Sequence, residues 1–169
     1  MHSKIKKLTV SALLAALACV ATMVIKIPSP LHGYINLGDC MVLLAGWILA
    51  PGYGFLAAGL GSALADLFSG YAMYAPATFL IKGAMALIAF ACFKLLNQRL
   101  GKLPAQIIGG ILAELAMILG YLVFEGFLYG FAASLVNIPA NAVQGAAGVV
   151  IGVVLIKAYE KAGLRGLVE

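Results

Sequence analysis

Five ionisable side chains lie inside long apolar stretches of this 169-residue chain or at the edges of those stretches. An ionisable group in an apolar setting is costly, and it generally faces the protein interior or a water-filled cavity. Buried carboxylates accept hydrogen bonds or act as acids and bases, and a buried lysine offers three donors to an anion or a carbonyl group. The five candidates for binding or catalysis are Asp39, Asp66, Lys82, Glu114 and Glu125.

Most of these residues also have a structural interpretation. Asp39 follows Gly38, and an aspartate suits the cap of a helix, which the sequence favours over a ligand contact. Asp66 and Lys82 suit an ion pair between neighbouring helices, and Glu125 suits a hydrated position at a helix end. Lys82 is the best ligand candidate, because burial of a lysine is expensive.

Amide and phenol side chains accompany the charged residues. Asn141 and Gln144 are three residues apart and share a helix face, where they either read the edge of a heterocycle or join helices by hydrogen bonds. Tyr121 shares a helix face with Glu114 and Glu125. Further tyrosines either stack on a planar ligand or belong to the aromatic belt of a membrane protein. They are Tyr34, Tyr71 and Tyr74.

The prolines divide the chain into six helical segments that position these side chains. Proline suits a loop or a first helical turn and breaks a helix interior, and all six prolines lie near edges of apolar stretches. Five segments reach the length of about 17–25 residues that spans a bilayer. The second is short, and it is either tilted or paired with the third as a re-entrant hairpin. The predicted helices cover about residues 8–25, 38–50, 52–69, 76–95, 104–126 and 138–158.

The composition places these helices in a membrane. The chain is 64% hydrophobic and 10% charged, with a mean hydropathy of +1.08, whereas soluble domains are about 25% charged. The apolar stretches continue to the C-terminus, so we expect one all-α integral membrane domain over residues 1–169 and no cleaved secretory signal. The three cysteines have no metal or redox spacing, and we expect neither a metal nor a cofactor.

The basic residues orient the six helices. Nine of the eleven Lys and Arg residues lie at helix ends on one side, which is the cytoplasm by the positive-inside rule. Both termini are then cytoplasmic, and the positive charge reflects orientation rather than nucleic-acid binding. The nine residues are Lys4, Lys6, Lys7, Lys94, Arg99, Lys102, Lys157, Lys161 and Arg165.

This orientation brings two polar stretches, residues 33–39 and 69–78, to the outer face. A helix rises about 1.5 Å per residue, so four of the five ionisable residues belong to the outer half of the membrane. Glu114 lies deeper. The sequence therefore predicts a polar site near the outer face.

Motifs of common enzymes are absent. There is no P-loop, no His-Glu-x-x-His and no nucleophile elbow, so we expect a protein that is not an enzyme. Two alternatives stay open. One is an intramembrane enzyme that uses Asp39, Asp66 and Glu114 as acid–base or metal groups. The other is a proton-coupled secondary transporter with Glu114 in a relay, although no two-fold repeat is visible.

Several blocks of sequence resemble the substrate-binding S component of energy-coupling factor (ECF) vitamin transporters, in the riboflavin and hydroxymethylpyrimidine or pyridoxine branch. The resemblance covers nearly the whole chain. Ala12 and Ala16 match an Ala-x-x-x-Ala motif of this family, although the next step is Val20. The matching blocks are NLGD (36–39), APGYG (50–54), GSALADLFSGY (61–71), YAPATFLIKG (74–83) and NAVQG (141–145).

The resemblance implies a vitamin-binding subunit of the bacterial plasma membrane, with a lid formed by the first outer loop. It implies three partners, a transmembrane coupling protein and two ATPases, and a chain that topples in the bilayer to deliver its ligand. Ala12 and Ala16 would dock the coupling protein, or else pack inside the bundle. We favour vitamin B6 or hydroxymethylpyrimidine over riboflavin as the ligand. The expected ligand-binding residues are Tyr34, Asn36, Asp66, Tyr74, Lys82, Tyr121, Glu125, Asn141 and Gln144.

Overall fold

The computed structural model describes residues 2–29 and 33–164, and helices make up most of this part of the chain. Two three-residue strands, β1 (Lys26–Pro28) and β2 (Tyr34–Asn36), form an antiparallel ribbon in which Lys26 lies opposite Asn36. The helices are α1 (His2–Val24), α2 (Asp39–Ile48), α3 (Pro51–Phe68), α4 (Ala75–Leu100), α5 (Lys102–Tyr129), α6 (Phe131–Ser134), the 3₁₀ turn η1 (Leu135–Asn137) and α7 (Ile138–Lys161).

The six predicted helices are present, and the second is short as expected. Two outer connections contain elements that were not predicted, the β1–β2 ribbon in the first and α6 with η1 in the last. Helices α4 and α5 also extend beyond their predicted ends. Both end at glycines with positive φ, Gly101 (82°) and Gly130 (92°), a conformation that glycine adopts without steric cost.

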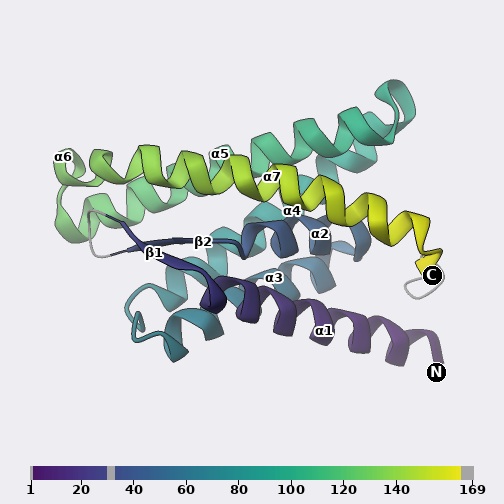
Figure 1. The fold of residues 1–169 in the computed structure, drawn as a ribbon, viewed down its shortest axis with the longest axis horizontal. Coiled ribbons are helices and arrows are strands. Elements are labelled where there is room, and N and C mark those ends of the chain that lie inside the picture. The colour runs from purple at the N-terminus through teal and green to yellow at the C-terminus, as the bar shows by residue number, and fades with distance from the viewer. Residues whose placement is uncertain (1, 30–32, 165–169) are drawn as a thin grey trace.

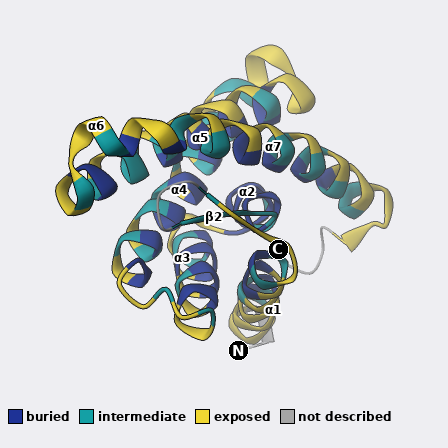
Figure 2. Ribbon diagram, turned by 60° about the vertical axis from the view of Figure 1, so that its left-hand side comes forward, coloured by how far each residue is buried: buried dark blue, intermediate teal, exposed yellow. Residues whose placement is uncertain are grey.

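Four helical stretches are long and apolar enough to cross a membrane: Lys4–Val24, Ala75–Leu100, Lys102–Tyr129 and Phe131–Lys161. Helix α3 has 18 residues and is not among these four stretches. Helix α2 has only 10 residues and nearly all of them are buried. A helix that is apolar all round belongs in the interior of a bundle. Figure 2 shows α2 among α1, α3, α4 and α7, which explains why a short helix is stable at this position.

All the long helices run roughly along one axis, so the molecule has two distinct ends (Figure 1). Both ends of the chain and the α4–α5 turn at Gly101 lie at one end, and the ribbon and α6 lie at the other. The first of these ends carries the predicted cytoplasmic basic residues, except that Arg165 lies outside the described residues. This end is cytoplasmic by the positive-inside rule, and the ribbon therefore faces outward.

The small residues of α1 separate into an inner and an outer stripe. If Gly61 of α3 were replaced by a residue with a side chain, the new Cβ would lie 2.3 Å from the backbone oxygen of Ala15. Helices α1 and α3 therefore approach each other backbone to backbone at this point. Ser11 and Cys19 lie on the same buried side of α1. Ala12 and Ala16 are exposed, so the alternative that these two alanines pack inside the bundle is wrong.

Candidate ligand-binding site

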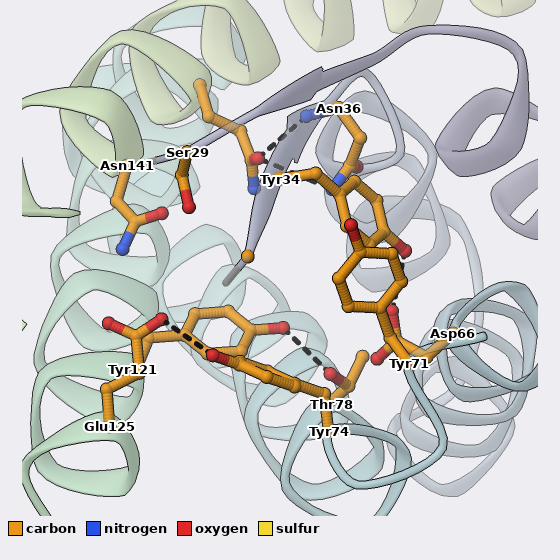
Figure 3. Close-up of a pocket in the computed structure, with 12 residues that line it drawn as sticks. Ser29, Tyr34, Asn36, Asp66, Tyr71, Tyr74, Thr78, Tyr121, Glu125 and Asn141 are labelled. Carbon is orange, nitrogen blue, oxygen red and sulfur yellow. Dashed lines mark hydrogen bonds between the residues drawn. The ribbon is translucent and has the colours of Figure 1, made fainter. Parts of the chain in front are cut away.

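A polar cavity lies at the outer end of the bundle, beneath the ribbon and between the outer ends of α3, α4, α5 and α7 (Figure 3). The space open to the centre of a water-sized sphere is about 30 Å³. One water needs roughly 10–15 Å³ by this measure, so the closed cavity has room for about two waters. Its lining residues are Ser29, Gly33, Tyr34, Asn36, Asp66, Tyr71, Tyr74, Thr78, Tyr121, Glu125, Asn141 and Gln144.

Strand β2 covers the cavity and is fastened at two points. The Tyr34 hydroxyl donates to Oδ1 of Asp66 at 2.6 Å. Burial, together with the nearby Asp66 carboxylate, raises the pKa of the Tyr34 phenol above its usual range, so the phenol remains a donor. The backbone N–H of Asn36 donates to Oε1 of Gln144 at 2.8 Å, and the Asn36 amide reaches the same oxygen at 3.3 Å. Strand β2, called the cover below, is therefore attached to both α3 and α7.

Asp39 lies below the cavity at the start of α2 and has no exposed surface. Its Oδ1 accepts a hydrogen bond from the Lys82 ammonium, with which it forms a buried ion pair. Its Oδ2 accepts from the Gln144 amide at 2.6 Å. Gln144 therefore links the cover to the ion pair, since its oxygen binds Asn36 and its nitrogen binds Asp39.

This arrangement corrects two predictions. Asp39 does not cap α2, because Gly38 occupies the N-cap position and no side chain makes a cap hydrogen bond there. Lys82 does not pair with Asp66, because its ammonium bonds Asp39 and lies 5.5 Å from the Tyr121 ring centroid. Helix periodicity alone could not predict the Asp39–Lys82 ion pair, because it joins residues that are 43 positions apart.

Eight of the nine expected ligand-binding residues line this cavity. The exception is Lys82, which lies outside the lining and contacts the lining residue Tyr121. Among the eight, Asn141 makes no hydrogen bond within the part of the chain that the structure describes, so its amide can be offered to a ligand. Binding of a ligand by these residues stays a prediction.

Glu125 is buried rather than hydrated, contrary to its structural interpretation. Both of its carboxylate oxygens accept from the Asn137 amide, at 2.9 and 3.0 Å, and Oε1 accepts a long bond of 3.5 Å from the Tyr74 hydroxyl. Asn137 occupies the N-cap position of α7 without capping it by its side chain. The short turn before α7 therefore positions an amide against the carboxylate of the lining residue Glu125.

Aromatic rings and hydroxyls complete the lining. The Tyr71 ring contacts two other tyrosine rings, in a tilted arrangement with Tyr34 at a centroid distance of 4.8 Å and edge-to-face with Tyr74 at 6.3 Å. The Thr78 and Tyr121 hydroxyls are 3.0 Å apart and bonded to each other. Ser29, Tyr71 and Thr78 were absent from the expected set of binding residues.

A spacing signal could have identified Thr78. It lies four residues after Tyr74 and four before Lys82, so all three share one face of α4. Ser29 had no comparable signal, because its place in the lining depends on the unpredicted ribbon.

Glu114 lies apart from the cavity, packed against the glycines of α7. It is buried, and neither carboxylate oxygen has a hydrogen-bond partner among the described residues. If Gly148 were replaced by a residue with a side chain, the new Cβ would lie 2.8 Å from Oε1 of Glu114 and 2.9 Å from Cβ of Asp39. The side chains of Glu114 and Asp39 therefore both pack against Gly148. Asp66 instead lines the cavity. No group of three metal-ligating side chains is found within residues 2–29 and 33–164.

The fold and the site together define a multi-pass helical membrane protein with a covered polar cavity near its outer face. The chain belongs to the family of S components of ECF-type riboflavin transporters, whose family model matches residues 2–161. The family consists of transporter subunits rather than enzymes, so the intramembrane enzyme finds no support. The predicted helical membrane fold and the location in the cell membrane are confirmed.

Individual relatives span most of the chain. An uncharacterised protein of Pyrococcus woesei is 35% identical over 134 residues, which are 79% of this chain and 87% of that protein. The thiamine precursor transporter HmpT of Lactococcus lactis subsp. cremoris is 26% identical over 166 residues, which are 96% and 93% of the two chains.

Two solved structures are also similar. The S component of a bacterial ECF transporter has 27% identity and a TM-score of 0.76, and the match covers 94% of this chain and 97% of the other. A biotin S component solved at 2.1 Å has 24% identity, a TM-score of 0.55 and coverage of 92% and 93%. This second likeness shows the fold alone.

Proposed function

We propose that this chain captures a vitamin at the outer face of the membrane and that the cavity beneath the ribbon is the vitamin site. The observation that carries the proposal is the cavity itself, which eight of the nine expected binding residues line. Small-molecule sites are concave and combine aromatic walls with a few polar groups that fix orientation. The tyrosines, amides and carboxylates of this cavity have that composition.

The ligand we propose is a small aromatic heterocycle, with vitamin B6 or hydroxymethylpyrimidine favoured over riboflavin. The likeness to a thiamine precursor transporter supports a single small ring. The limited volume of the closed cavity supports the same choice, because a three-ring flavin needs a larger displacement of the cover. The family's riboflavin model keeps riboflavin as the next candidate.

The lining suggests a role for each group. Tyr34 and Tyr74 would stack on the ring, and the Asn141 amide would read its edge as both donor and acceptor. Asn36 and Gln144 would hold the cover closed above the ligand. Lys82 would act through its contacts with Asp39 and Tyr121 instead of touching the ligand. Tyr121, Asp66 and Glu125 would complete the polar walls.

Entry of a ligand would require the cover to lift. The closed cavity is too small for a heterocycle, and the cover is held by the Tyr34–Asp66 and Asn36–Gln144 hydrogen bonds. Each such bond contributes only about 0.5–3 kcal/mol net. Thermal motion can therefore break both bonds and lift the strand from the cavity. The ribbon would then be the lid that the sequence resemblance implies.

Transport would depend on partner proteins. The chain has no P-loop, so we propose that two ATPase subunits hydrolyse ATP and that a transmembrane coupling protein joins them to this chain. The exposed Ala12 and Ala16 on α1 would form the docking surface. Small residues at spacing four let a second helix approach closely in lipid.

Leucine at Ala12 and Ala16 is expected to reduce recovery of the complex with the coupling protein at least about tenfold, a change of about 1.4 kcal/mol. The added side chains would hold the partner helix away, while the ligand affinity of the isolated chain would not change. Affinity purification of the complex and ligand titration of the isolated chain measure the two effects. Ala91→Leu, at an exposed alanine of α4, is the matched control. Loss of ligand binding in the α1 variant would contradict a docking role.

The proposed function is tested by ligand recovery. The chain is purified alone, denatured, and its released small molecules are identified by mass spectrometry. A stoichiometric vitamin recovered unchanged is the expected result. Recovery of a chemically altered lipid together with turnover of that lipid would overturn the proposal.

A further inference from the structure

The outer cavity has an uncompensated acidic character. Its lining contains two carboxylates, Asp66 from α3 and Glu125 from α5, and no lysine or arginine among the described residues. Figure 3 shows these two carboxylates on opposite sides of the cavity. They are 4% and 3% exposed. Carboxylates buried to this degree are normally paired with a cation.

Neither carboxylate forms an ion pair with a lysine or arginine among the described residues. Asp66 accepts from the Tyr34 phenol, and Glu125 accepts from the Asn137 amide and the Tyr74 phenol, all of which are neutral donors.

The two lysines nearest the cavity are engaged elsewhere. The Lys82 ammonium is paired with Asp39 below the lining. The Lys26 ammonium lies outside the lining, where it donates to the Ser69 hydroxyl at 3.0 Å. Any negative charge that these two carboxylates carry therefore has no ion-pair partner in the cavity lining that the structure describes.

One oxygen of this pair is also unused as an acceptor. Oδ2 of Asp66 is buried and has no hydrogen-bond partner within the described residues. A buried acceptor without a partner costs free energy, and a ligand donor placed against it recovers that cost. Asp66 therefore lines the cavity with one buried acceptor oxygen still unbonded, and Glu125 places a second carboxylate on the opposite side of the cavity.

We infer that this site selects a donor-rich ligand that binds as a cation, namely an aromatic nitrogen heterocycle with a protonated ring nitrogen and an amino or hydroxyl group beside it. This inference rests on the proposed function and adds the charge and hydrogen-bonding class of the ligand. A ring N–H next to an amino group forms a two-donor fork, which matches a carboxylate as an arginine does. The Asp66 carboxylate accepts both hydrogen bonds of this fork, and Glu125 stabilises the positive charge from the other side of the ligand.

The same geometry rejects two other ligand classes. A ring edge that presents carbonyl oxygens, as a flavin does on both sides of its single N–H, turns acceptors toward carboxylate acceptors. A phosphate ester brings negative charge into an acidic cavity that has no basic lining residue, and such like-charge contacts are strongly unfavourable. The site therefore takes up the unphosphorylated, aminated form of a vitamin.

Calorimetric titration of the purified chain tests this inference with three probes of one ring skeleton. They are amino-hydroxymethylpyrimidine, the analogue in which a ring carbonyl replaces the amino group, and the phosphate ester of the first compound. The amino compound is expected to bind about 10- to 100-fold more tightly than each of the other two, which is the range for a hydrogen bond to a charged group. This comparison needs no mutation, so it does not depend on the folding of a variant.

Two variants assign the effect to the carboxylates. D66N and E125Q are each expected to weaken binding of the amino compound by about tenfold or more, and D66N is expected to narrow the preference over the carbonyl analogue. E160Q, which removes a carboxylate from the cytoplasmic end of α7, is the matched control and should leave all three affinities unchanged. Thermal unfolding confirms that each variant is folded.

The possible failures are distinguishable. Equal affinity for the amino and carbonyl compounds, tighter binding of the phosphate ester, or an unchanged preference in D66N overturns the inference and leaves vitamin binding intact. Tight binding of riboflavin with no binding of the pyrimidines overturns it in the same way. A folded chain that binds no vitamin overturns the proposed function itself.

Discussion

Replacement of Lys82 by methionine is expected to lower the free energy of unfolding by about 3–5 kcal/mol. Methionine fills a similar volume but leaves Asp39, which has no exposed surface, as a buried carboxylate without its ammonium partner. The Gln144 amide still donates to that carboxylate, but a neutral donor does not compensate a full charge. Thermal and denaturant unfolding in detergent micelles measures the loss.

The double variant Asp39→Asn/Lys82→Met is the control for this prediction. Removal of both charges avoids the uncompensated carboxylate, so the double variant should be closer in stability to the wild type than Lys82→Met alone. Additive losses in the double variant would mean that the two residues do not form the coupled pair described here.

Replacement of Gln144 by leucine is expected to cost about 2–4 kcal/mol of stability and to speed ligand release. The change removes the acceptor of the Asn36 backbone N–H and a donor to the Asp39 carboxylate, and each loss is worth about 1–3 kcal/mol. Because the first of these bonds fastens β2 over the cavity, the cover should open more often. Unfolding experiments and stopped-flow ligand dissociation measure the two consequences.

Asn141→Leu separates the structural role of Gln144 from ligand contact. Asn141 lies on the same helix one turn earlier and lines the cavity, but it makes no hydrogen bond within the described residues. Its replacement should change stability by less than about 0.5 kcal/mol, while ligand affinity falls. Equal loss of stability in the two variants would contradict the role assigned to Gln144 as the link between cover and ion pair.

The helices and the outer position of the polar cavity could be predicted because they depend on local patterns. Proline positions and apolar stretches determine where each helix begins, and the charge asymmetry determines which end faces outward. Tyr34, Tyr74 and Asn141 then follow as outer-end residues of their segments. Their placement at the same outer end of the bundle needs only the parity of the crossings and no knowledge of side-chain contacts.

The hydrogen-bond partners could not be predicted because they depend on helix rotation and on long-range packing. Gln144 and Asp39 are 105 residues apart, and their contact is set by how α2 sits in the centre of the bundle. The ribbon has strands of three residues, too short for a period-two pattern to be recognised. On α1, the sequence contains two stripes of small residues, and only the position of Gly61 on α3 decides which of them faces inward.

The central claim is that the cavity beneath β1–β2 binds a small aromatic vitamin, and isothermal titration calorimetry of the purified chain tests it most directly. The account predicts saturable one-to-one binding of vitamin B6 or hydroxymethylpyrimidine with a Kd below about 1 μM. No chemical change of the ligand is expected, and affinity should be lost in Asn141→Leu. A folded chain that binds none of these compounds nor riboflavin, or that binds with unchanged affinity in Asn141→Leu, would contradict the account.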